Sequence, residues 1–222
     1  MIPNVCSDPE LNEITAALDC AGDCEAARAK GGVYAIRNLL EMVPAVRRLA
    51  EGPLRELAAG ILGEDCFAVR GILFDKRPEA NWLVPWHQDL TIAVAEKLNV
   101  EGFGPWTEKA GIPHVQPPAT VMEAMLAVRL HLDDCSVENG PVRVLAGSHR
   151  LGRLSAREIE AMRASADEVT CTVPRGGVLL MRPLLLHSSS PATSPNHRRV
   201  IHIEYAATPL PGGLRWQGQS RN

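Results

Sequence analysis

Hydrophobic and polar positions follow one period in the first 65 residues. Apolar side chains recur there every three to four positions, as in Leu11, Ile14 and Leu18, and this spacing is typical of helices with one buried face. The pattern predicts a helix over 8–21, which begins after Asp8-Pro9, and helical structure over 41–61. The N-terminal region of the chain is therefore expected to be helix-rich.

The pattern changes at Cys66, where short β-rich runs broken by Gly, Pro and Asp begin. A strand is also expected earlier, at 33–37. The strands predicted after Cys66 span 66–74, 82–89, 121–132, 141–146, 168–173, 177–188 and 199–207. Many short strands in succession are typical of a β-sandwich or barrel, so the prediction is a mainly β fold with flanking helices packed on one sheet.

Two segments interrupt this succession of strands. Residues 92–118 contain seven Gly and Pro residues, which predicts a long irregular loop over one mouth of the sheets. Residues 155–164 begin with Ser155 and carry Glu158 three positions later, which is the pattern of a capping box. A short helix is therefore expected between two strands.

Length and charge limit the classes of protein to consider. The 222 residues suit one domain, with a helix-rich region over 1–65, a β core over 66–207 and a tail over 208–222. A formal net charge of −3 gives no basic field for nucleic acid or an anionic membrane surface, and no apolar run is long enough for a membrane span. The six scattered cysteines and the absence of a recognisable leader favour reduced thiols in a cytoplasmic protein.

The segment Asn81-Trp-Leu-Val-Pro-Trp-His-Gln-Asp89 holds the first candidate metal ligands. His87 and Asp89 are separated by one residue in a predicted strand, so both side chains lie on the same face. A third ligand has to come from another strand, and the candidate is His187, at the end of an apolar run. Two imidazoles and one carboxylate leave open coordination positions of the kind that iron(II) oxygenases use, although zinc hydrolases can use a similar set.

Three blocks of sequence resemble the phytanoyl-CoA dioxygenase family of iron(II)- and 2-oxoglutarate-dependent oxygenases. They are Pro85-Trp-His-Gln-Asp89, the stretch 130–149 with its Glu-Asn-Gly-Pro turn and Gly-Ser-His ending, and 187–198, which begins His-Ser-Ser and ends in arginine. The resemblance extends over about residues 31–207, although Ala192 stands where many members carry Asn. It implies a double-stranded β-helix (jelly-roll, cupin-like) core, iron(II) as cofactor and 2-oxoglutarate and O₂ as cosubstrates.

The resemblance also implies roles for single residues. Arg198, eleven residues after His187, takes the position of the arginine that binds the distal carboxylate of 2-oxoglutarate, and Ser189 resembles a second hydrogen-bond donor to that carboxylate. A planar guanidinium suits a carboxylate, because it forms two parallel charge-assisted hydrogen bonds. Arg199 is the rival, but it faces the other side of the strand.

Further pocket residues are expected around this site. Arg129 and His131 alternate with leucines, so they point into the core if the leucines face the helices. Arg129 then either pairs with an acid or meets an anionic substrate or cosubstrate. Trp86, Lys76 and Asn81 flank the first ligand strand and are candidates for the pocket mouth, although core packing or solvation would also explain them.

Together these features predict a dioxygenase that hydroxylates a small molecule, releasing succinate and CO₂. In related halogenases a small residue replaces the carboxylate ligand, so Asp89 argues against halogenation. Desaturation, cyclisation and epimerisation stay open. The alternative is a cupin-like hydrolase or isomerase that consumes no O₂, but such an enzyme would leave Arg198 without a function.

Overall fold

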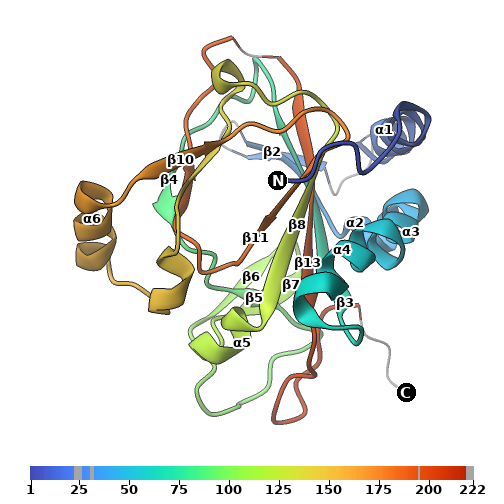
Figure 1. Ribbon diagram of the computed structural model, residues 1–222. Helices are drawn as coiled ribbons and strands as arrows, with labels where there is room; N and C mark the ends of the chain where they lie inside the picture. Colours follow the sequence, from blue (N-terminus) through green and yellow to red (C-terminus); the bar gives the residue numbers. More distant parts are fainter. Residues whose placement is uncertain (23–26, 31–32, 195, 219–222) are drawn as a thin grey trace.

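Two antiparallel sheets face each other in the computed structural model, which describes residues 1–22, 27–30, 33–194 and 196–218 (Figure 1). The major sheet has the order β1-β2-β3-β13-β8-β11, and the minor sheet has the order β10-β9-β12-β4. The major-sheet strands are β1 (Ala27–Lys30), β2 (Val33–Arg37), β3 (Phe67–Lys76), β13 (Arg198–Ala206), β8 (Met125–His131) and β11 (Val178–Met181). The minor-sheet strands are β10 (Glu168–Cys171), β9 (Val142–Leu145), β12 (His187–Ser189) and β4 (Val84–His87).

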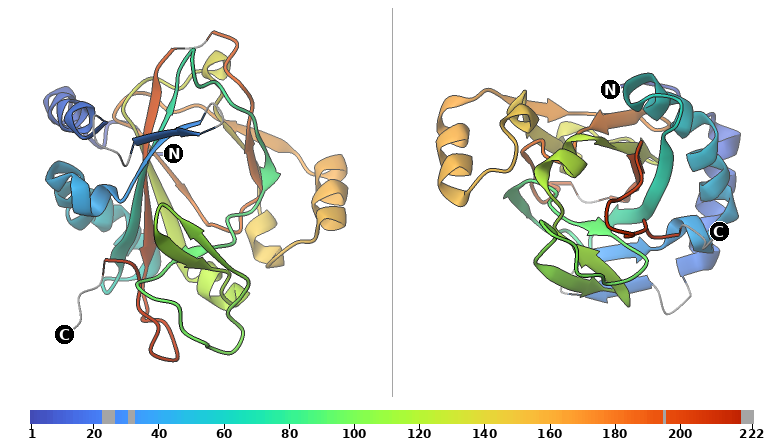
Figure 2. Two further views of the ribbon diagram at one scale, coloured as in Figure 1. Left: turned by 180° about the vertical axis from the view of Figure 1, so that it is seen from behind. Right: turned by 90° about the horizontal axis from the view of Figure 1, so that it is seen from below.

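The chain passes repeatedly between the two sheets. After β3 it crosses to β4, returns to β8, crosses to β9 and β10, and then alternates through β11, β12 and β13. This arrangement is a cupin-like double-stranded β-helix, so the predicted fold class is confirmed. The sheets splay apart and do not close into a barrel (Figure 2).

Four N-terminal helices cover the outer face of the major sheet (Figures 1 and 2). They are α1 (Asp8–Gly22), α2 (Leu39–Met42), α3 (Pro44–Glu51) and α4 (Pro53–Leu62). The prediction for 8–21 is confirmed. The helical structure predicted over 41–61 is divided between separate helices, because Pro44 and Pro53 each begin a new one. Proline favours the first position of a helix, where its missing N–H costs no hydrogen bond.

Side chains of β8 alternate between the face of the sheet that packs against the helices and the face that lines the space between the sheets. Leu126, Val128 and Leu130 join the core that packs against α1, α3 and α4, while Arg129 faces the space between the sheets. The prediction of a strand over 121–132 is wrong at its start, where α5 (Ala119–Glu123) precedes β8. Short 3₁₀ helices lie on either side of β9, η1 (Val137–Asn139) before it and η2 (Ser148–Leu151) after it.

The predicted strand over 177–188 is in fact two strands. β11 ends at Met181, a turn carries the chain across to the minor sheet, and β12 begins at His187. Pro183 lies in that turn, where it has no ladder hydrogen bond to donate. The turn is closed by the Leu185 N–H, which donates to the Arg182 carbonyl at 3.0 Å.

Residues 92–118 are not an irregular loop. They form a third sheet, ordered β5-β7-β6, from β5 (Ile92–Ala93), β6 (Trp106–Lys109) and β7 (Ile112–Val115). β6 and β7 make a tight hairpin whose two turn residues, Ala110 and Gly111, both have positive φ. Lys109, on β6 of this small sheet, lines the cavity between the main sheets.

The predicted helix near 155–164 is α6 (Ala156–Ser165), and it has the expected capping box. The Ser155 side chain accepts from the Glu158 N–H, and the Glu158 carboxylate accepts from the Ser155 N–H. Within the described residues, no helix is both long and apolar enough to cross a bilayer. The described cysteines Cys6, Cys20, Cys66, Cys135 and Cys171 are free thiols, and Cys24 lies outside the described residues.

Candidate metal centre and anion site

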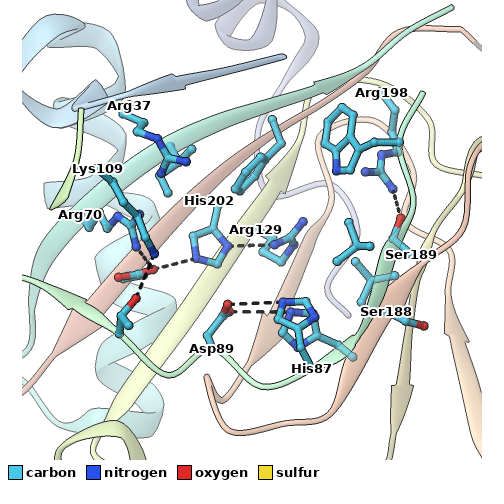
Figure 3. Close-up of a pocket in the computed structure, with 18 residues that line it drawn as sticks. Arg37, Arg70, His87, Asp89, Lys109, Arg129, Ser188, Ser189, Arg198 and His202 are labelled. Carbon is cyan, nitrogen blue, oxygen red and sulfur yellow. Dashed lines mark hydrogen bonds and ion pairs between the residues drawn. The ribbon is translucent and has the colours of Figure 1, made fainter. Parts of the chain in front are cut away.

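A cavity of about 250 Å³ lies between the two sheets and holds every candidate ligand (Figure 3). Strand register explains which side chains reach it. Arg198, Val200, His202 and Glu204 share the inner face of β13, and His202 is paired in register with both Ile72 of β3 and Arg129 of β8. The inner face of the major sheet therefore carries several charged side chains in rows across the strands.

His87, Asp89 and His187 come together on the minor-sheet side. His87 on β4 and His187 on β12 are directly opposed in the strand register, and their ring centroids are 4.2 Å apart. Asp89 Oδ1 is 3.7 Å from His87 Nε2, and Asp89 Oδ2 is 3.8 Å from His187 Nε2. One ligand atom from each residue lies within 4.8 Å of the others, so the three could hold one metal ion.

Backbone contacts orient each of these ligands. The Nδ1 atom of His87 is 2.8 Å from the Pro85 carbonyl, and the Nδ1 atom of His187 is 2.8 Å from the Leu185 carbonyl. A carbonyl only accepts, so both rings carry their proton on Nδ1 and turn Nε2 toward Asp89. The Asp89 N–H donates to the Pro183 carbonyl at 2.9 Å, which fixes the backbone just after β4.

The charges at the three residues also suit a cation. Burial lowers the pKa of His187 to about 4, so this imidazole is neutral near pH 7 and its Nε2 lone pair is available. Burial alone would raise the pKa of Asp89, but His187, His202, His87 and Arg129 outweigh it and lower the pKa of this carboxyl. An ionised carboxylate beside two imidazoles that present their Nε2 atoms is a donor set that divalent transition metals bind.

Arg198 lies at one end of the cavity, beside Ser189 (Figure 3). Its Nη1 donates to the Gly140 carbonyl and is 3.4 Å from Ser189 Oγ, while its Nε is buried and has no hydrogen-bond partner in the described part of the chain. The Ser189 hydroxyl donates to the Gly140 carbonyl at 2.8 Å and accepts from Lys76 Nζ at 2.7 Å. In this arrangement Ser189 holds the two cations in place.

Lys76 is 1% exposed and lies behind Ser189, not at the cavity mouth. Burial and the neighbouring Arg198 lower the pKa of Lys76 to about 7. Among the described residues, neither Lys76 nor Arg198 forms an ion pair with a carboxylate. Two buried cations side by side are unfavourable without an anion, so this end of the cavity suits a ligand carboxylate.

Arg129 begins a chain of polar contacts across the middle of the cavity. Its Nη1 donates to His202 Nδ1 at 2.9 Å, and His202 Nε2 lies 3.4 Å from Glu204 Oε1. Because His202 Nδ1 accepts, Nε2 carries the proton and faces the carboxylate. Glu204 also accepts from Arg70 Nη1 at 3.1 Å. Arg129 thus lines the cavity without a direct acidic partner among the residues that the structure describes.

The other predicted pocket residues lie at its margins. His131 is 2% exposed, neither of its ring nitrogens has a hydrogen-bond partner among the described residues, and burial lowers its pKa to about 3. Trp86 lies under the Arg143 guanidinium, 5.7 Å away, on the opposite face of β4 from His87. Asn81 bonds both the N–H and the carbonyl of Ala192. None of the three lines the cavity, whereas Trp82 does.

Sequence reasoning missed several residues that line the cavity. His202 and Glu204 could have been found, because they follow Arg198 at even spacings on one strand. Arg37, Arg70 and Lys109 could not, because they come from three strands whose pairing the sequence does not reveal. Arg199, expected to face away, binds Asp133 outside the cavity, with Nη2 2.7 Å from Oδ1.

Comparisons with known proteins agree with this picture. The sequence model described as phytanoyl-CoA dioxygenase matches residues 10–200. A search of curated proteins finds no match. Among solved structures, AviO1 from Streptomyces viridochromogenes Tue57 has 23% identity and a TM-score of 0.66, with 94% of this chain and 90% of that chain covered.

Two other solved structures contain ligands. The epimerase SnoN, in complex with Fe³⁺, alpha ketoglutarate and nogalamycin RO, has 18% identity and a TM-score of 0.71, covering 100% of this chain and 90% of its own. HygX from Streptomyces hygroscopicus, with nickel and 2-oxoglutarate bound, has 16% identity and a TM-score of 0.65, covering 93% and 81%. At these identities the likeness establishes the fold that the three proteins share with this chain.

Proposed function

The chain belongs to the phytanoyl-CoA dioxygenase family, and from this premise we propose that it is an iron(II)- and 2-oxoglutarate-dependent oxygenase that hydroxylates a small molecule. One observation carries the proposal. A two-histidine, one-carboxylate cluster and a buried arginine with no carboxylate partner among the described residues face the same cavity. The first suits the metal and the second suits the cosubstrate.

We assign the metal to His87, Asp89 and His187. Their donor atoms are two imidazole nitrogens and one carboxylate oxygen, all oriented by backbone contacts. Three protein ligands on one side of an ion leave its other positions to face the cavity. Bound iron(II) would supply the activation of O₂ that is coupled to conversion of 2-oxoglutarate into succinate and CO₂.

We assign the distal carboxylate of 2-oxoglutarate to Arg198, with Lys76 adding positive charge from behind Ser189. Arg198 Nε has no acceptor among the described residues, so this N–H is available to a ligand carboxylate. A hydrolase or isomerase that needs no dicarboxylate would leave both buried cations uncompensated, which is unfavourable. This difference favours the oxygenase over the cupin-like alternative.

Hydroxylation is proposed over halogenation because Asp89 supplies a carboxylate to the metal site. The solved structures of this fold include an epimerase, SnoN, and a carbocyclase, SnoK. The outcome therefore depends on how a substrate is held over the metal, which the ligand set alone does not decide.

The test compares Arg198→Gln with Arg199→Gln. Both variants remove one guanidinium from β13, but only the first faces the cavity. We expect Arg198→Gln to weaken 2-oxoglutarate binding by roughly tenfold to a hundredfold, because one charge-assisted pair is lost, and Arg199→Gln to leave it unchanged. Binding is measured by calorimetry with Ni(II) in place of iron, and turnover by succinate formation. Equal affinity in the two variants would refute the assignment.

A further inference from the structure

A second group of cations lines the end of the cavity opposite Arg198 (Figure 3). It consists of Arg37 on β2, Arg70 on β3 and Lys109 on β6, and we call it the distal cation cluster. The assignments made above for metal and cosubstrate use none of these three side chains. Their positions therefore need a separate explanation.

The distal cation cluster is too far from Arg198 for one molecule of 2-oxoglutarate to contact both. Glu204, the register partner of Arg70, lies six residues beyond Arg198 on β13. At about 3.3 Å per residue, this separation is roughly 20 Å along the strand. A five-carbon diacid is much shorter than that, so a 2-oxoglutarate bound to Arg198 leaves the cluster free for another ligand.

The cluster also carries more positive charge than the described residues neutralise. Glu204 and Asp89 are the acidic residues that line the cavity, and Asp89 belongs to the metal site. Glu204 is paired with Arg70 at 3.1 Å. That leaves Arg37 and Lys109, and among the described residues neither forms an ion pair with a carboxylate; Lys109 Nζ is 3.2 Å from the Thr91 hydroxyl.

Placing these cations together is unfavourable in the protein alone. Both Arg37 and Lys109 are partly buried, and burial together with repulsion from Arg70 lowers the pKa of each side chain. An exposed arginine or lysine would avoid this cost by extending into water. Partly desolvated like charges in a cavity beside a metal site indicate a site for an anion.

We propose that the substrate carries an oxyanion, a carboxylate or a phosphate, that is bound by Arg37, Arg70 and Lys109. The proposal rests on the oxygenase function above and names its substrate class. His87 and Asp89 of the metal site lie between the cluster and Arg198, so an anion held at one end directs the rest of the molecule toward the metal (Figure 3). The cavity of about 250 Å³ suits a small acid or phosphate ester.

The first test measures binding of inorganic phosphate and of acetate to protein saturated with Ni(II) and 2-oxoglutarate. The test variant is the double variant Arg37→Gln/Lys109→Met, which leaves the Arg70–Glu204 pair intact. Its matched control is Arg48→Gln/Lys97→Met, which removes one exposed arginine and one exposed lysine outside the cavity. A charge-conserving double variant, Arg37→Lys/Lys109→Arg, tests whether charge suffices.

We expect phosphate or acetate to bind wild type and the matched control with equal affinity. The test variant should bind the probe at least about tenfold more weakly, and the charge-conserving variant should regain the wild-type affinity. Stronger binding of phosphate identifies a phosphoryl group, and stronger binding of acetate a carboxylate. Equal affinity of both probes for wild type and the test variant would overturn the proposal.

Measurement of 2-oxoglutarate binding separates this proposal from the proposed function. If the test variant binds 2-oxoglutarate like wild type but has lost the phosphate or acetate site, both proposals stand. If wild type does not bind 2-oxoglutarate at all, the oxygenase assignment fails whatever the anion data show. In a turnover screen, carboxylic acids or phosphate esters should stimulate succinate formation, and their neutral amides or parent alcohols should not; the reverse result would also overturn the proposal.

Discussion

At the scale of single residues, the cosubstrate end of the site is marked by two buried cations that form no ion pair with a carboxylate among the described residues. Lys76 and Arg198 are 1% and 3% exposed, share Ser189 as a hydrogen-bond partner and form no ion pair among the described residues. Burying such a pair costs free energy that folding alone does not return. We interpret this cost as preorganisation for a ligand carboxylate, because the two cations are already held in position.

The affinity for 2-oxoglutarate is predicted to fall as pH rises above 7. The pKa of Lys76 is lowered from 10.5 to about 7, so below pH 7 it adds a positive charge and above pH 7 it is increasingly neutral. An anion binds the protonated form better, so binding takes up a proton and the dissociation constant rises with pH. Calorimetry at pH 6 to 9, in two buffers of different ionisation enthalpy, measures both effects.

Lys76→Met is the variant that tests the source of this pH dependence. It should bind 2-oxoglutarate with the weak affinity that wild type has at high pH, and its affinity should not change with pH. Lys97→Met, which removes an exposed lysine, should keep the wild-type profile. A steep profile that persists in Lys76→Met would assign the titration to another group.

Site residues that share one strand could be predicted from alternation, whereas the distant His187 was found at the end of an apolar run and Arg198 through the family resemblance. His87 and Asp89 are two positions apart on one strand, and alternation alone places them on one face. Arg129 was found in the same way. His202 was missed although its even spacing after Arg198 places both on one face of β13, and its contact with Arg129, 73 residues away, follows only from the pairing of β8 with β13. The distal cation cluster was hidden for the same reason.

At the scale of secondary structure, predictions failed where a turn had no recognisable signal. The β6–β7 hairpin turns at Ala110-Gly111 with positive φ at both residues, and alanine rarely adopts that conformation. With Asn or Asp at position 110 the hairpin would have been predicted. Conversely, Pro183, Pro44 and Pro53 were present as signals of chain breaks, but the apolar periodicity around them suggested longer elements.

Gly140 is predicted to be essential for the turn that supports Arg198. Its φ is +61°, and an added Cβ would lie 2.5 Å from the Ser190 carbonyl oxygen. The carbonyl of Gly140 also accepts hydrogen bonds from Arg198 and Ser189. Gly140→Ala should therefore both destabilise the fold, by about 2 to 4 kcal/mol, and weaken 2-oxoglutarate binding, because the backbone must shift.

Gly147→Ala is the matched control for this prediction. Gly147 has a φ of +81°, yet an added Cβ would meet nothing within 4 Å. This variant should lose only about 1 kcal/mol, which is the cost of a left-handed alanine, and should keep its 2-oxoglutarate affinity. Chemical denaturation compares the two variants. If they were equally stable, the close contact with Ser190 would not be what constrains position 140.

At the scale of the whole molecule, residues of both sheets line the cavity. His87 and His187 lie on β4 and β12 of the minor sheet, whereas Arg198 and Lys76 lie on β13 and β3 of the major sheet. A metal bound by the proposed ligands would join β4 to β12, and a 2-oxoglutarate reaching from that metal to Arg198 would connect the two sheets. Ligand binding and global stability should therefore be linked.

Thermal unfolding is predicted to show this linkage in two steps. Ni(II) at a hundred times its dissociation constant should stabilise the protein by about 2.7 kcal/mol, which for a chain of this size corresponds to roughly 5 to 11 °C in the melting temperature. Addition of 2-oxoglutarate should raise the melting temperature again, but only when the metal is present. Asp89→Ala should lose both increments, because it removes a metal ligand, while Arg198→Gln should keep the first and lose the second. If 2-oxoglutarate stabilised Arg198→Gln as much as wild type, the cosubstrate would not connect the two sheets through Arg198.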